Sequence, residues 1–165
     1  METRIKLLGH PIHPMLIVLP LGLLSTAAVF DVLYVVTGNA ELATFAYWAM
    51  LVGVIGGLLA ALFGVIDWMA IPKETRARRI GLLHGSGNVV VVLLFALSWL
   101  ARGGSGPYLP DMLPVLLSLV AAAIALFTAW LGGELVYRLR VAVDDDAGLD
   151  AGSSLERHGM ADVEA

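Results

Sequence analysis

The sequence contains no cysteine. This absence excludes disulfide bonds, thiolate metal sites, haem attached through a Cys-x-x-Cys-His motif, and cysteine catalysis. Charged residues are also scarce, at 15%, whereas 59% of the residues are hydrophobic and the mean hydropathy is +0.85. Soluble domains contain about 45 to 50% apolar residues. The composition therefore predicts an integral membrane protein in which any cofactor is held by His, Asp, Glu or Met side chains.

Motifs of hydrolases and nucleotide-binding proteins are missing as well. The sequence has no Gly-x-Ser-x-Gly elbow, no phosphate-binding loop and no glycine fingerprint after a strand. The basic segment 73–79 has four positive charges, which suit anionic lipid headgroups better than a nucleic acid. We therefore expect the lipid bilayer to be the main partner, and we expect no nucleic acid.

Four apolar stretches are long enough for the roughly 20 residues that a helix needs to span a bilayer. They cover about residues 14–37, 42–71, 80–101 and 112–139, and the connections between them are short. Short connections make successive helices antiparallel neighbours. The sequence thus predicts an all-α membrane protein, an up-down bundle of four transmembrane helices within residues 1–143. We find no internal repeat.

The charged residues at the helix ends predict the orientation. Cytoplasmic loops carry the excess of Lys and Arg. Nine of the ten basic residues fall on the side of the two termini, and Arg102 alone falls on the other side. We therefore expect both termini in the cytoplasm. Residues 144–165 are acidic and poor in apolar residues, which predicts a disordered cytoplasmic tail.

The segment Gly9-His10-Pro11-Ile12-His13-Pro14 stands at the mouth of the first apolar stretch. A residue before proline is disfavoured in helical geometry, so both histidines are expected in extended backbone, with Pro14 as the first helical residue. Pro20 lies within this helix and removes the hydrogen bond to the Leu16 carbonyl, which favours a kink.

Ionisable side chains within membrane helices are costly and mark a function or a buried pair. In this sequence they gather at the cytoplasmic ends of all four predicted helices, where six polar residues form one layer: His10, His13, Asp67, His84, Asn88 and Glu134. Asp31 stands apart. It lies 18 residues beyond His13, which places it about 27 Å away at the outer end of the bundle.

Three motifs together resemble the bacterial membrane family known as domain of unknown function 2231. They are the Gly9–Pro14 entrance with Phe30-Asp31, the run Gly81-Leu-Leu-His84-Gly85-Ser-Gly-Asn88, and Gly132-Gly133-Glu134-Leu-Val-Tyr137. The resemblance covers about residues 9–143. It implies a four-helix protein of the bacterial inner membrane without an established activity. Relatives joined to Rieske iron–sulfur or cytochrome domains imply a redox role and a redox partner protein.

The polar layer suggests a cofactor site for electron transfer. Histidines on facing helices commonly hold haem iron in membrane bundles, so His13 and His84 are the candidate ligands of haem b. Gly81, Gly85 and Gly87 would clear space for the porphyrin, and His10, Asp67, Asn88 and Glu134 would support the imidazoles. The same layer could instead hold a non-haem metal ion through His13, His84, Asp67 and Glu134.

Two other interpretations remain open at this point. In the first, the layer is structural: its side chains hydrogen-bond across helices and fix their register, with Glu134 paired to Arg138 one turn away. In the second, Asp31 and the layer are the two ends of a proton or ion relay. The relay lacks an ionisable residue at mid-depth.

Overall fold

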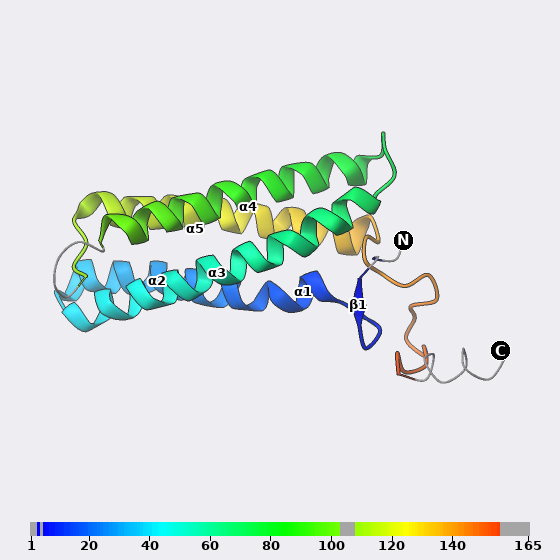
Figure 1. Cartoon of the computed structure of the whole chain (residues 1–165), viewed down its shortest axis with the longest axis horizontal. Coiled ribbons are helices and arrows are strands. Elements are labelled where there is room, and N and C mark those ends of the chain that lie inside the picture. Colours follow the sequence, from blue (N-terminus) through cyan, green and yellow to red (C-terminus); the bar gives the residue numbers. More distant parts are fainter. Residues whose placement is uncertain (1–2, 4, 103–107, 156–165) are drawn as a thin grey trace.

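The computed structural model describes residues 3, 5–102 and 108–155. A small antiparallel pair of strands, β1 (Lys6–Leu7) and β2 (His10–Pro11), precedes the helices. The helices are α1 (Ile12–Leu16), α2 (Val18–Thr37), α3 (Ala40–Ala70), α4 (Arg76–Ala101) and α5 (Met112–Gly133), and a π-helical turn, η1 (Glu134–Arg138), continues α5. Successive long helices run antiparallel, and strand β1 and the described residues after η1 lie at the same end of the bundle (Figure 1).

Four of these helical segments are long and apolar enough to cross a membrane, within the residues that the structure describes. They are Ile12–Thr37, Ala40–Ala70, Arg76–Ala101 and Met112–Arg138. Most of their large apolar side chains point away from the bundle, with Val36, Leu126 and Leu62 among the most exposed. Such an outward apolar surface is what a bilayer requires of a spanning bundle. The predicted all-α membrane fold is confirmed.

The first helix begins earlier than its prolines suggest. Pro11 caps α1, so His13 lies inside the first helical turn and not in extended backbone, although it precedes Pro14. The helical geometry of His13 is fixed by a hydrogen bond from the amide of Ile17 to its carbonyl. Only Ile17 separates α1 from α2; it keeps right-handed helical angles, and Pro20 has no amide hydrogen to give to the Leu16 carbonyl. The chain therefore remains helical past Pro20, from Ile12 to Thr37.

The bundle is built from two helical hairpins. Helix α2 packs mainly against α3, and α4 packs mainly against α5, with fewer contacts between the two pairs. Figure 1 shows the pairs one above the other. Arg78 joins them at the end that carries the histidines: its guanidinium donates to the carbonyls of Trp68 and Ile71 and lies 3.8 Å from the centre of the Trp68 ring. We call this end of the bundle the histidine end.

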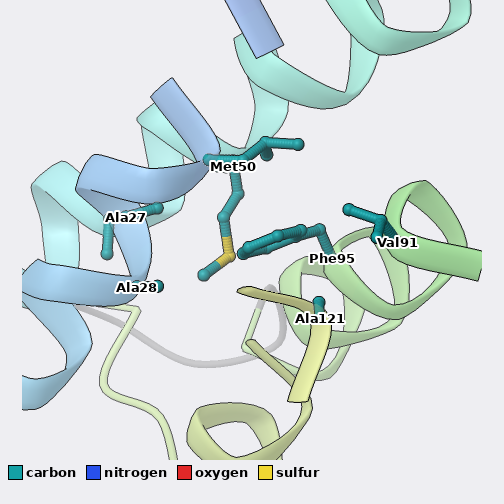
Figure 2. Close-up of a cluster of buried hydrophobic side chains, with 8 residues drawn as sticks. Ala27, Ala28, Met50, Val91, Phe95 and Ala121 are labelled. Carbon is teal, nitrogen blue, oxygen red and sulfur yellow. The ribbon is translucent and has the colours of Figure 1, made fainter. Parts of the chain in front are cut away.

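An apolar core fills the middle of the bundle. Met50 of α3 reaches across to Phe95 of α4, and both side chains are almost fully buried (Figure 2). Small side chains allow the helices to approach around this pair, as is common in membrane bundles. The other buried members of the cluster are Leu24, Ala27, Ala28, Ala46, Val91 and Ala121. This cluster separates the polar residues of the histidine end from Asp31.

Candidate functional site

His13 is held against helix α3 by a carbonyl and a glycine. Its Nδ1 lies 2.9 Å from the carbonyl oxygen of Ala60. Because a carbonyl only accepts, Nδ1 carries the proton. One turn further along α3, Gly64 makes room for the ring: a Cβ on Gly64 would lie 2.9 Å from Cε1 of His13. None of the described residues hydrogen-bonds to Nε2, so this nitrogen keeps its lone pair available.

His84 is held against helix α5 in the same way. Its Nδ1 donates to the carbonyl of Thr128 over 2.8 Å, and a Cβ on Gly132, one turn further along, would lie 3.2 Å from its Cε1. The remaining ring nitrogen, Nε2, lies 3.3 Å from the side-chain nitrogen of Asn88. That amide donates more closely to the His84 carbonyl, at 2.8 Å, so its contact with the ring is the weaker one. We call each histidine with its carbonyl and glycine an imidazole mount.

The two mounts and Asp67 belong to one layer. Asp67 and His84 each lie within electrostatic range of the His13 ring. All three residues are half-buried, and so is Asn88, whose Oδ1 accepts a hydrogen bond from Thr128. The structure therefore brings together four of the six residues that the sequence assigned to the layer.

The other two residues of the predicted layer have partners elsewhere. His10 is exposed on strand β2, and its Nε2 lies 3.3 Å from the hydroxyl of Ser154. Glu134 accepts a hydrogen bond of 2.7 Å from Arg76 at the start of α4, and not from Arg138. Arg76 is reachable because the helix starts four residues before the expected position, at a cap formed by Thr75.

The glycines expected to clear a porphyrin face are arranged differently. A Cβ on Gly81 would lie 2.8 Å from the Trp68 ring, and one on Gly87 would lie 2.5 Å from the methyl group of Thr128. These two glycines therefore make room for neighbouring side chains. Gly85 faces open space, because a Cβ added there would meet no atom of the described residues within 4 Å. The expected porphyrin cradle is therefore not formed by Gly81 and Gly87.

Carboxylates contribute little to a metal site in this arrangement. Among the described residues, no three His, Asp or Glu side chains gather closely enough to hold a metal ion. The donor set that the geometry offers is thus the pair of imidazoles, His13 and His84, with Asp67 nearby.

Asp31, at the opposite end of the bundle, is sealed from solvent. Its carboxylate receives two hydrogen bonds from Arg102, of 2.8 and 3.1 Å, and a third from the hydroxyl of Ser118. Arg102 also bonds to the hydroxyl and carbonyl of Ser98. The Asp31 and Arg102 side chains are both 0% exposed. Sequence analysis missed this pair, although one acid and one base at the same end of an apolar bundle are a signal for it.

Residues 9–145 match a known family, described as predicted membrane protein, domain of unknown function 2231. The chain belongs to this family. The resemblance inferred from the three motifs is therefore confirmed. No curated protein and no solved structure matches the chain.

The region shared with the DUF2231 family contains both imidazole mounts and the Asp31–Arg102 ion pair. The family description adds the membrane setting and assigns no activity. Within this DUF2231 chain, His13, Asp67 and His84 are half-buried at the histidine end, whereas Asp31 and Arg102 at the opposite end are buried and paired with each other. A ligand-binding role is therefore best sought at the histidine end.

Proposed function

We propose that this membrane protein binds a transition metal through Nε2 of His13 and Nε2 of His84, as haem b iron or as a free ion, and serves electron transfer. One observation carries the proposal: in both mounts the Nδ1 proton is given to a backbone carbonyl of the neighbouring helix. Histidines that ligate metals almost always donate their other ring N–H in this manner, which fixes the tautomer and the ring orientation.

The chain's residues prepare the two imidazoles for this task. The carbonyls of Ala60 and Thr128 hold the rings in the tautomer that leaves Nε2 without a proton. Asp67 places a carboxylate within electrostatic range of His13, where it offsets positive charge. A bound iron would supply the capacity to take up and release one electron. The half-buried position of both histidines limits the access of water to that site.

The proposed setting is the inner membrane of a bacterium, with the histidine end in the cytoplasm. The basic residues expected there lie in the loop before α4, in the first turn of α4, and at and just after the end of η1: Lys73, Arg76, Arg78, Arg79, Arg138 and Arg140. In this orientation a redox partner protein would reach the site from the cytoplasm. Basic residues at this end also suit anionic lipid headgroups.

A structural role without a cofactor is the second candidate. The mounts are themselves contacts between helices, since His13 bonds α1 to α3 and His84 bonds α4 to α5. Hydrogen bonds of this kind stabilise membrane bundles by about 0.6 to 2 kcal/mol each. A proton relay has less support, because the apolar core around Met50 and Phe95 lies between the histidine end and Asp31, which is ion-paired with Arg102.

The test is to measure the metal and haem content of the full-length protein, purified in detergent from cells supplied with haem and iron. We expect about one bound metal per chain, measured by elemental analysis together with a reduced-minus-oxidised absorption spectrum. A haem spectrum would identify haem b, whereas a metal without that spectrum would identify a free ion. His13→Ala and His84→Ala should each lose the bound species.

The matched control is His10→Ala, because His10 is exposed on β2 and lies outside the mounts. This variant should retain the bound species. A protein without any stoichiometric metal, or His13→Ala and His84→Ala variants that retain it, would contradict the proposed function and leave the structural role as the better account.

A further inference from the structure

The first helices of the two hairpins carry polar residues at the same spacing. Eighteen residues separate His13 from Asp31, and eighteen residues separate His84 from Arg102. A shift of 71 residues therefore superimposes one imidazole on the other and the acid on the base. At the histidine end the shift pairs two histidines, and at the other end it pairs an acid with a base.

The second helices of the hairpins repeat in the same manner. In each of them a carbonyl accepts from a histidine and the glycine four residues later lies under that ring: Ala60 with Gly64, and Thr128 with Gly132. A shift of 68 residues relates the two pairs. The same shift matches five identical residues between 46–69 and 114–137, which are Leu51, Val52, Leu58, Ala61 and Gly64 with their counterparts Leu119, Val120, Leu126, Ala129 and Gly132.

The same shifts of 71 and 68 residues also pair buried positions of the two hairpins. Leu24 corresponds to Phe95, and Met50 corresponds to Ser118, and all four are buried. Further buried pairs are Ala27 with Ser98, Ala46 with Pro114, and Gly53 with Ala121. The faces that the hairpins turn toward each other are therefore equivalent, although most of the residues on them differ.

The Asp31–Arg102 ion pair shows where the two-fold axis that relates the hairpins lies. Asp31 and Arg102 occupy the same position of their respective hairpins, and they contact each other directly. When two units are related by a two-fold axis, equivalent positions meet only on that axis. Both hairpins also run in the same direction through the bundle, so the axis runs along it. His13 and His84 occupy equivalent positions at the other end of the bundle, each held by a carbonyl and a glycine of its own hairpin.

We infer that the chain consists of two equivalent hairpins, Ile12–Ala70 and Arg76–Arg138, and that its metal site is a single centre held by both imidazole mounts together. This inference rests on the proposed function. Gly64 and Gly132 are its positioning residues, because each decides where the imidazole of its own hairpin lies. The binding site is thus divided equally between the hairpins, and neither holds a complete site.

The mounts are tested by ¹⁵N NMR of the histidine rings, without any metal. The sample is the full-length protein in detergent at alkaline pH, with His10→Gln and His158→Gln, so that two neutral rings remain. Both rings should show the Nδ1–H tautomer. Gly64→Ala should shift the His13 signals and leave those of His84, and Gly132→Ala should do the reverse. Gly85→Ala, whose methyl group meets open space, should shift neither.

The single centre is tested by titrating the same samples with Co²⁺ alone. We expect one Co²⁺ per chain, with the signals of both rings changing together, and affinity about 10-fold to 100-fold weaker in Gly64→Ala and Gly132→Ala. Two Co²⁺ per chain, or a response of one ring only, would overturn the shared centre and with it the proposed binding through both imidazoles, while the equivalence of the two hairpins would stand.

The remaining outcomes separate the two claims. An Nε2–H tautomer in either ring, or a glycine variant that shifts both rings alike, would overturn the equivalence of the mounts. A protein with both Nδ1–H tautomers that binds neither Co²⁺ nor haem would overturn the proposed function and the shared centre, while the equivalence of the hairpins would stand on the spectra.

Discussion

Asp31 and Arg102 lie 71 residues apart in the sequence, and their side chains meet in the bundle with an N–O distance of 2.8 Å and no exposure to solvent. The carboxylate also accepts from Ser118, and the guanidinium donates to Ser98, so the pair is surrounded by hydrogen-bonding groups. Buried charges are tolerated when they are paired and their remaining hydrogen bonds are satisfied. The pair therefore fastens the first hairpin to the second at the end remote from the histidines.

Breaking this ion pair should destabilise the bundle strongly. In Asp31→Asn, Arg102 keeps its charge in a buried site without a counter-charge, and the expected loss is about 3 to 5 kcal/mol. Exchanging the residues, by Asp31→Arg together with Arg102→Asp, should recover most of the loss, because the two positions are equivalent and face each other. Thermal unfolding in detergent measures both effects. A double variant that is less stable than Asp31→Asn would contradict the equivalence of the two positions.

Gly87 should be far more sensitive to substitution than Gly85, two positions away on α4. A Cβ on Gly87 would lie 2.5 Å from the Thr128 methyl group, whereas a Cβ on Gly85 meets nothing within 4 Å. Overpacking of this kind costs about 1 to 3 kcal/mol. Gly87→Ala should therefore lower the unfolding temperature. Gly85→Ala should not, since alanine favours a helix more than glycine does. Equal effects of the two variants would argue against the close contact between α4 and α5.

The orientation can be tested directly because the protein has no cysteine of its own. Lys73→Cys places a thiol in the loop before α4, and Glu41→Cys places one at the start of α3, both at exposed positions. With the histidine end in the cytoplasm, a membrane-impermeant maleimide should label Glu41→Cys in intact spheroplasts. It should label Lys73→Cys after the membrane is opened. The reverse pattern would show the opposite orientation.

The sequence alone predicted the helices and the location of the important polar residues. Apolar stretches of membrane-spanning length settle the number of helices, and the gathering of His13, Asp67, His84 and Asn88 at one end follows from their positions along those helices. The prediction placed the start of the first helix at Pro14, whereas α1 includes His13. There the intrinsic preference of a residue before proline gives way to the hydrogen bond from Ile17.

The partners of the polar residues could not be read from the sequence, because they depend on which helices are neighbours. The imidazole mounts use backbone carbonyls, which every residue has, so no side-chain pattern identifies Ala60 or Thr128 as partners. Gly81 and Gly87 illustrate the same difficulty, since a glycine next to a polar residue indicates free space whatever fills it, and here Trp68 and Thr128 fill it. The repeat of the two hairpins was not visible in the sequence, because equivalent positions are buried alike but mostly hold different residues.

The burial of Arg102 also changes how the charges of the loops should be counted. Arg102 is the one basic residue of the sequence that falls on the side opposite the two termini, so it is the sole exception to an otherwise complete charge asymmetry. Its positive charge is matched by Asp31 inside the bundle. With this pair removed from the count, every Lys and Arg of the sequence falls on the side of the termini. The electrostatic bias that orients the chain during insertion is therefore stronger than a simple count of its basic residues indicates.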